Sequence, residues 1–169
     1  MIIVTGMDNT GKTTLAQKLA EDLNLPVVKS IGPNTEWNQR IWVEDRIKDY
    51  EKGVDCIFDR FVSLEELVYG PILRERSNFS FTEALVHLHY ISPLIIYTRP
   101  STNKILDFGD RFQMDGVKSQ AMDLIEAYDE LMLQLMAYNL DIKVYSYEAN
   151  NGNHEHLVNH YIKNKEEYI

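Results

Sequence analysis

The stretch Gly6-Met7-Asp8-Asn9-Thr10-Gly11-Lys12-Thr13 decides the fold, because it matches the pattern G-x-x-x-x-G-K-[ST] of a phosphate-binding loop. Residues 2–5 before it form a short apolar run that ends in threonine, and three leucines after it recur at helical spacing. Strand, glycine loop and helix therefore follow in the order that the motif requires. Such a loop turns its backbone N–H groups toward an anion, and a helix that begins at about Lys12 points its positive end at the same place. The sequence predicts a site for a nucleoside triphosphate.

Individual side chains of this loop have distinct expected roles. Lys12 supplies a mobile cation for the β- and γ-phosphates, and the Thr13 hydroxyl is expected on Mg²⁺. ATP and Mg²⁺ are therefore the predicted cofactors. The residues predicted to bind the triphosphate are Gly6, Asn9, Thr10, Gly11, Lys12, Thr13 and Thr14.

The composition is that of one globular domain. The 169 residues are enough for a substantial core, and no repeat or linker divides them, so we expect a single domain over 1–169. A net charge of −9 argues against broad binding to nucleic acid, although one anion site in a cleft is compatible with it. The lone cysteine, Cys56, favours a reducing, cytoplasmic location. No stretch approaches the ~20 apolar residues that cross a bilayer, so no membrane partner is expected.

Strand and helix signals alternate along the rest of the chain. This alternation predicts an α/β fold with three layers, a five-stranded parallel sheet and helices on both faces. A break or kink in one helix is expected at Gly70-Pro71, and Ser80 with Glu83 forms a capping-box pattern. The expected strands are 2–5, 27–28, 54–58, 94–97 and 142–147, and the expected helices begin at about 12, 35, 63, 80, 119 and 153.

Residues 98–117 are polar and lack a sustained period. They contain Pro100, Gly109 and Gly116, which are typical of an irregular segment. We predict that this segment is a mobile lid rather than packed core.

The carboxyl ends of parallel strands meet at one edge of a sheet, so the loops after the strands are expected to share a site. Asp59, at the end of the third strand, is predicted to help hold Mg²⁺. Arg60 can grip a phosphate with its planar fork of donors. Lys29 follows the second strand and either meets an acceptor phosphate or is a solvated loop lysine. Arg99 follows the fourth strand.

At this point the sequence resembles the thymidylate kinase family of nucleoside monophosphate kinases, within the larger P-loop kinase group. The resemblance lies in the glycine loop with an acid at its third position, in Asp59-Arg60-Phe61 followed by Tyr69-Gly70, and in Gly109-Asp110-Arg111-Phe112-Gln113, which is similar to the family's lid motif. Most of the chain is spanned by these motifs.

The resemblance implies a set of roles around an acceptor nucleotide. Asp8 would orient the acceptor sugar, Arg60 would bind its monophosphate, and Phe61 would lie near the acceptor site. As aromatic residues, Phe61 and Tyr69 are also the candidates to stack on a base. Arg111 or Arg99 would reach the transferring phosphoryl group from the lid. The family usually has Arg-Glu-Pro near Lys29 and a Glu where this chain has Gln113, so the exact acceptor stays open. The implied substrate is a deoxynucleoside monophosphate such as thymidylate or a related pyrimidine nucleotide, and the chain is a possible homodimer.

Three other functions remain open from the residues. A deoxynucleoside kinase would need a carboxylate to take the proton of a neutral hydroxyl, and the stretch 28–31 after the second strand contains none, so Asp8 or Glu36 would have to serve. A nucleotide-responsive switch protein would need no acceptor pocket. A kinase acting on nucleotides inside DNA is disfavoured by the acidic charge.

Overall fold

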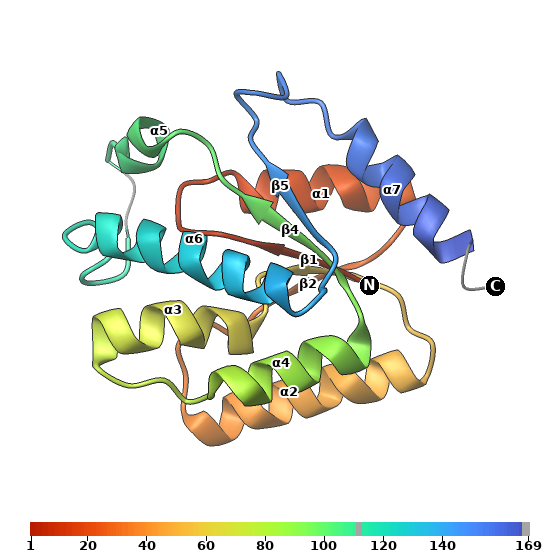
Figure 1. The fold of residues 1–169 in the computed structure, drawn as a ribbon, viewed down its shortest axis with the longest axis horizontal. Coiled ribbons are helices and arrows are strands. Elements are labelled where there is room, and N and C mark those ends of the chain that lie inside the picture. The colour runs from red at the N-terminus through yellow and green to blue at the C-terminus, as the bar shows by residue number, and fades with distance from the viewer. Residues whose placement is uncertain (111–112, 167–169) are drawn as a thin grey trace.

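Five parallel strands form one sheet in the order β2-β3-β1-β4-β5. This computed structural model describes residues 1–110 and 113–166. The strands are β1 (Ile2–Thr5), β2 (Val27–Lys29), β3 (Ile57–Asp59), β4 (Leu94–Thr98) and β5 (Ile142–Tyr145). Because β1 lies at the centre, the loop that follows it opens at the middle of the sheet's carboxyl edge (Figure 1).

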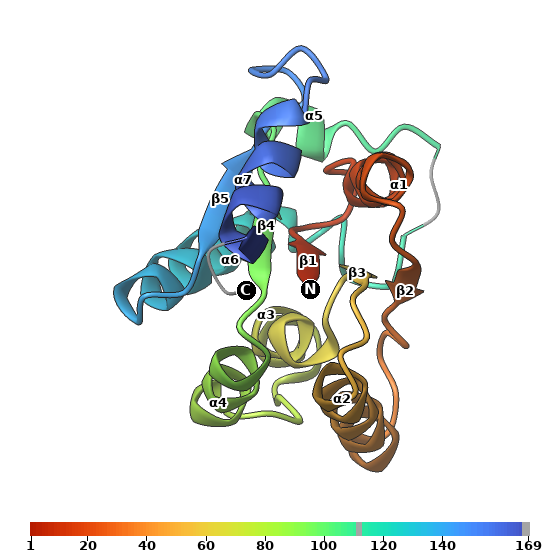
Figure 2. The same ribbon diagram turned by 90° about the vertical axis from the view of Figure 1, so that its right-hand side faces the viewer.

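Helices cover both faces of the sheet, as Figure 2 shows. One face carries two helices, and the other carries four. The first pair is α1 (Lys12–Leu23) and α7 (Glu155–Glu166). The second group is α2 (Glu36–Glu51), α3 (Val62–Arg74), α4 (Phe81–Ile91) and α6 (Ala121–Ala137), and the short α5 (Thr102–Leu106) follows β4. The predicted three-layer α/β fold with a five-stranded parallel sheet is confirmed.

The central strands are apolar because both of their faces are buried. Along β1, Ile2 and Val4 pack toward α1 and α7, whereas Ile3 packs toward α3 and α6. All three side chains are fully buried. This packing holds β1, and with it the start of the glycine loop, rigidly between two hydrophobic layers.

Several predicted boundaries are wrong. The fifth strand ends at Tyr145 rather than at residue 147. The third strand starts at Ile57 rather than at residue 54, because Asp55 is held by α7, where Tyr161 and Lys165 donate to its carboxylate, and Val54 is exposed. Helix α3 does not break at Gly70-Pro71 but continues to Arg74. Proline removes one N–H from a helix, and the following residues stay helical where they pack against the core, as Ile72 and Leu73 do. The Ser80 capping box is confirmed.

The segment 98–117 differs from the expectation of an unpacked loop. It contains α5, and its side chains at Ile105, Phe108 and Val117 are buried in the main core. Ile105 and Phe108 stand at helical spacing, but the next buried apolar residue is Val117, so the sequence shows no sustained period over the segment. The expectation that this segment lacks core residues is wrong; its mobility stays a prediction.

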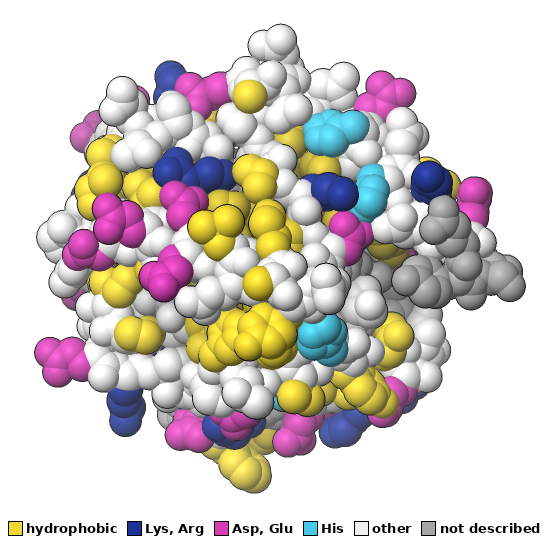
Figure 3. Space-filling model, in the orientation of Figure 1, with side chains coloured by type: hydrophobic (Ala, Val, Ile, Leu, Met, Phe, Trp, Pro, Cys, Tyr) yellow, Lys and Arg dark blue, Asp and Glu magenta, His cyan; other side chains and the backbone are white. Residues whose placement is uncertain are grey.

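The face that Figure 3 shows bears charged side chains of both signs. Lys and Arg side chains there are scattered among Asp and Glu instead of forming one basic area. In the part of the chain that the structure describes, no helix has the length and apolar character needed to span a membrane.

Candidate active site

The glycine loop lies against the end of β4. Gly6 has a φ of +135°, and a Cβ at this position would come within 2.6 Å of the Thr98 carbonyl oxygen and 2.7 Å of its Oγ1. Only glycine fits such a close approach. The Thr10 hydroxyl lies 2.7 Å from Thr98 Oγ1 and donates to the Met7 carbonyl oxygen at 2.9 Å. These contacts join the loop to itself and to the end of β4.

Lys12 begins α1 and points into this loop. Its side chain is only 4% exposed, and its Nζ contacts the carbonyl oxygen of Met7 and, at 3.4 Å, Thr10 Oγ1. Burial and then the positive charge of Arg60 lower the pKa of Lys12 well below its usual value. A phosphate at the loop would supply the counter-charge that this ammonium lacks.

The pair Thr13 and Asp59 fits a magnesium site. Thr13 Oγ1 donates to Asp59 Oδ2 at 2.7 Å, which joins the start of α1 to the end of β3. The other carboxylate oxygen, Asp59 Oδ1, is buried and has no hydrogen-bond partner among the described residues. A hydroxyl and a carboxylate are the oxygen ligands that Mg²⁺ takes beside phosphates, so these two residues suit the ion.

Arg60 is the centre of an ion-pair cluster. Its backbone has a φ of +74°, and its N–H donates to the Val4 carbonyl oxygen at 3.0 Å, which fixes the turn after β3. The guanidinium donates to Glu65 Oε1 at 2.7 Å and to Asp8 Oδ1. Asp8 also accepts from the Tyr69 hydroxyl at 2.9 Å. Arg60 is therefore held by carboxylates from the glycine loop and from α3.

These charges set the ionisation of Asp8. Burial opposes the charged carboxylate, but the positive charges of Arg60 and Lys12 outweigh it, so the pKa of Asp8 lies below its ordinary value. The Asp8 carboxylate is thus ionised near neutral pH. It lines the cavity described next.

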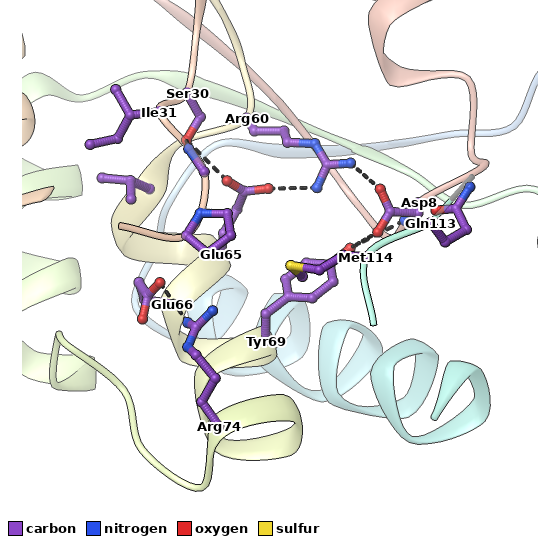
Figure 4. Close-up of a pocket in the computed structure, with 13 residues that line it drawn as sticks. Asp8, Ser30, Ile31, Arg60, Glu65, Glu66, Tyr69, Arg74, Gln113 and Met114 are labelled. Atoms are coloured by element: carbon purple, nitrogen blue, oxygen red, sulfur yellow. Dashed lines mark hydrogen bonds and ion pairs between the residues drawn. The ribbon is translucent and has the colours of Figure 1, made fainter. Parts of the chain in front are cut away.

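A cavity of about 360 Å³ opens beside this cluster (Figure 4). Arg60 reaches between Glu65 and Asp8 on one side, and Arg74 lies beside Glu66 at the other end. Ser30 Oγ donates to Glu65 Oε2 at 3.0 Å, and Arg74 donates to Glu66 at 2.6 Å. The lining residues are Asp8, Ser30, Ile31, Gly32, Pro33, Arg60, Val62, Glu65, Glu66, Tyr69, Arg74, Gln113 and Met114.

Another cavity, of about 430 Å³, is also lined by residues of the same loop. We call it the donor-side cavity and the first one the acceptor-side cavity, after the roles that the sequence predicts for the residues lining each. It adjoins the start of α1 and the end of β5. Its lining residues are Asn9, Gly11, Thr14, Leu15, Lys18, Lys104, Asp107, Tyr145, Tyr147 and Gly152.

The structure brings together some of the predicted site residues and separates others. Asp8, Arg60 and Tyr69 line the acceptor-side cavity, whereas Lys29 is exposed and does not line it. Phe61 is fully buried, with its ring 5.3 Å from that of Trp42. It belongs to the core and not to the cavity wall.

The two predicted lid arginines have different outcomes. Arg99 is paired with Asp129 of α6, Nε to Oδ1 at 2.9 Å, and donates to the Pro100 carbonyl oxygen at 2.8 Å. Arg111 lies outside the described residues. Neither arginine therefore tests the prediction that a lid arginine contacts the transferring phosphoryl group.

Three charged residues of the acceptor-side cavity were not predicted. Glu65, Glu66 and Arg74 all lie on α3, and both glutamates are buried. A signal was present, because two adjacent glutamates interrupt an otherwise apolar run at 62–69, and buried carboxylates require partners. Their arginine partners are near in sequence, but Ser30 and Gln39, which also donate to them, are distant, so the pattern alone could not assign the cluster.

No protein-family model matches the chain, and no curated protein sequence matches it. Among solved structures, the YorR protein from Bacillus subtilis in complex with phosphorylated GDP is 22% identical, with a TM-score of 0.66 over 98% of this chain and 95% of that one. Deoxyadenosine kinase from M. mycoides with dCMP and dCDP is 19% identical, with a TM-score of 0.58 over 99% of both chains. The same kinase with bound dATP is 18% identical, with a TM-score of 0.58 over 97% of each.

These similarities establish the fold class. The chain has the P-loop kinase fold of these structures, and residues of its glycine loop line both cavities. The matches do not single out the thymidylate kinase family, so that finer resemblance belongs to the proposal below.

Proposed function

We propose that this protein is a phosphotransferase that moves the γ-phosphate of ATP onto a deoxynucleoside monophosphate. A pyrimidine nucleotide, such as thymidylate, is the proposed acceptor. The product would be the corresponding diphosphate.

One observation carries the proposal: residues of the phosphate loop line two different cavities. Asp8 lines the acceptor-side cavity, and its neighbour Asn9 lines the donor-side cavity. Two ligands bound there would present their phosphates to the same loop. Holding two reactants in one geometry is the main requirement of phosphoryl transfer. A nucleotide-binding switch would need only the cavity for the triphosphate.

The chain's own residues supply the groups for this transfer. Lys12 would bind the β- and γ-phosphates, and Arg60 would align the phosphate of the acceptor. Thr13 and Asp59 would hold Mg²⁺, which neutralises phosphate charge when bound. The ligands of the similar structures, which include phosphorylated GDP, dCMP and dATP, support sites of nucleotide size.

A deoxynucleoside acceptor is the second candidate, and one feature of the acceptor-side cavity favours it. Asp8 and Glu65 already neutralise Arg60, and Glu66 already neutralises Arg74. A nucleoside would bring a neutral hydroxyl, and Asp8 or Glu65 could take its proton. A monophosphate would have to displace carboxylates from the arginines or share the arginines with them. Sharing is possible because a guanidinium has five N–H donors, more than one carboxylate can use.

Cys56 supports a reducing location. It is buried, and burial raises the pKa of its thiol to about 11, so it stays protonated and inert. A cytoplasmic location and a homodimer remain proposals.

The decisive experiment offers purified protein, ATP and Mg²⁺ a panel of nucleosides and their monophosphates and separates the products by chromatography. Diphosphates formed from monophosphates would support the leading proposal. Monophosphates formed from nucleosides would establish the second candidate. Release of inorganic phosphate without a phosphorylated acceptor would contradict both.

A further inference from the structure

Asn9 joins the phosphate loop to α5. Its side-chain Nδ2 donates to the carbonyl oxygens of Lys104 at 3.0 Å, Ile105 at 3.0 Å and Asp107 at 2.9 Å. These oxygens lie at the carboxyl end of α5, where carbonyls have no partner inside the helix. The Asn9 side chain therefore caps α5 from a distant part of the sequence, and its amide nitrogen faces α5.

The same turn of α5 forms part of the donor-side cavity. Lys104 and Asp107 line this cavity together with Asn9 itself. At its other end, α5 is attached through Ser101, whose backbone N–H donates to Glu148 Oε2 at 2.7 Å. Ile105 is fully buried beneath it. Among the hydrogen bonds between described residues, those of the Asn9 side chain fix the wall formed by Lys104 and Asp107 to the loop.

We infer that Asn9 is a positioning residue, which sets the affinity for the triphosphate by holding α5 against the donor-side cavity. Its side chain acts through Lys104 and Asp107 and not by its own contact with a phosphate. This inference rests on the proposed function for the identity of the ligand, but the attachment of α5 can be tested separately.

Two substitutions remove the amide nitrogen without straining the loop. Asn9 has a φ of +65°, a conformation that glycine adopts freely and that aspartate tolerates. Asn9→Gly deletes the side chain, and Asn9→Asp keeps its shape but turns a second acceptor toward three carbonyl oxygens. Asn103→Ala is the matched control, because Asn103 lies exposed on α5 and its side chain makes no hydrogen bond to any described residue.

The attachment of α5 is measured by limited proteolysis with trypsin at the bond between Lys104 and Ile105, followed by mass spectrometry. We expect this cut to be about tenfold faster in both Asn9 variants than in the wild-type protein, because cleavage follows the population of the open form. Asn103→Ala should be cut at the wild-type rate. Equal rates in all four proteins would overturn the inference.

The effect on the ligand is measured by calorimetric titration with a non-hydrolysable ATP analogue and by steady-state kinetics. Both Asn9 variants should raise the Kd of the analogue and the KM for ATP about tenfold, while the KM for the acceptor stays unchanged. Faster cleavage with an unchanged Kd would also overturn the inference. If the wild-type protein bound no triphosphate, the proposed function would fail, whereas proteolysis would still decide whether Asn9 holds α5.

Discussion

In the proposed mechanism, phosphate binding depends most on Lys12. It is a buried cation that no carboxylate contacts directly, since its Nζ touches only Met7 and Thr10 among the described residues. We expect Lys12→Ala to lower kcat for phosphoryl transfer by at least about 100-fold, the effect of removing a preorganised donor at a developing charge. The melting temperature should not fall, because burial of the ammonium is itself unfavourable. Product formation and thermal unfolding are measured on the same preparation, and wild-type turnover by the variant would place the phosphate site elsewhere.

Arg60 links the loop after β3 to the acceptor-side cavity. Because its fork donates to two carboxylates at once, a point-charge ammonium cannot replace it. We expect Arg60→Lys to raise the KM for the acceptor about tenfold and Arg60→Ala to raise it further, with little change in the KM for ATP. Initial rates with each substrate varied in turn check this. An equal rise in both KM values would show a general loss of structure instead.

These residues also show what sequence could and could not predict. The roles of Gly6 and Thr13 are local, because the strand, loop and helix around them are consecutive in the chain. Glu65 pairs with Arg60, which precedes it by five residues, and accepts from Ser30, which lies beside it only because the loop after β2 packs against α3. Phe61 follows Arg60 directly, yet the turn after β3 sends its ring into the core. Spacing along the chain cannot report such directions.

Helix α3 carries the acceptor-side carboxylates and ends in a tightly packed turn. Gly70 lies inside this helix, where alanine would ordinarily be favoured by about 1 kcal/mol. A Cβ there would come within 2.6 Å of the Arg76 carbonyl oxygen and 2.9 Å of Ser77 Cα, both of which are backbone atoms. We therefore expect Gly70→Ala to destabilise the protein by about 1–3 kcal/mol, the cost of overpacking. Urea unfolding measures this, and a stabilised variant would mean that the turn 75–77 packs differently.

The ends of helices were predictable where the signal is local in the sequence, and they were predicted wrongly where tertiary packing decides the end. Thr35 caps α2 and Ser80 caps α4, each by accepting from a backbone N–H three residues later, as such side chains are known to do. Pro71 carries an equally clear signal to stop α3, but core contacts of the residues after it outweigh the loss of one hydrogen bond. A local rule therefore fails where the tertiary contacts oppose it.

Asp55 ties together distant parts of the molecule. It lies just before β3, and its carboxylate accepts from the Tyr161 hydroxyl at 2.6 Å and from Lys165, both near the end of α7. Burial alone would raise the pKa of Asp55, but these donors and the amino group of Met1 lower it to about 2 from an ordinary value of 3.8. The stabilisation is therefore complete above about pH 4 and is lost as the pH falls through about 2.

Asp55→Asn tests whether this link stabilises the fold. An amide has one acceptor oxygen and no charge, so we expect a loss of about 1–2 kcal/mol at pH 7, less than the full pKa shift implies because the cluster is partly solvated. The variant should also lose less stability than the wild-type protein between pH 4 and pH 2, which urea unfolding at several pH values measures. Asp45→Asn, whose only ion pair among the described residues is a solvent-exposed one with Lys48, is the control and should change stability by less than about 0.5 kcal/mol. If the two variants unfolded alike at every pH, α7 would be held by its apolar contacts with α1 and not by this charge cluster.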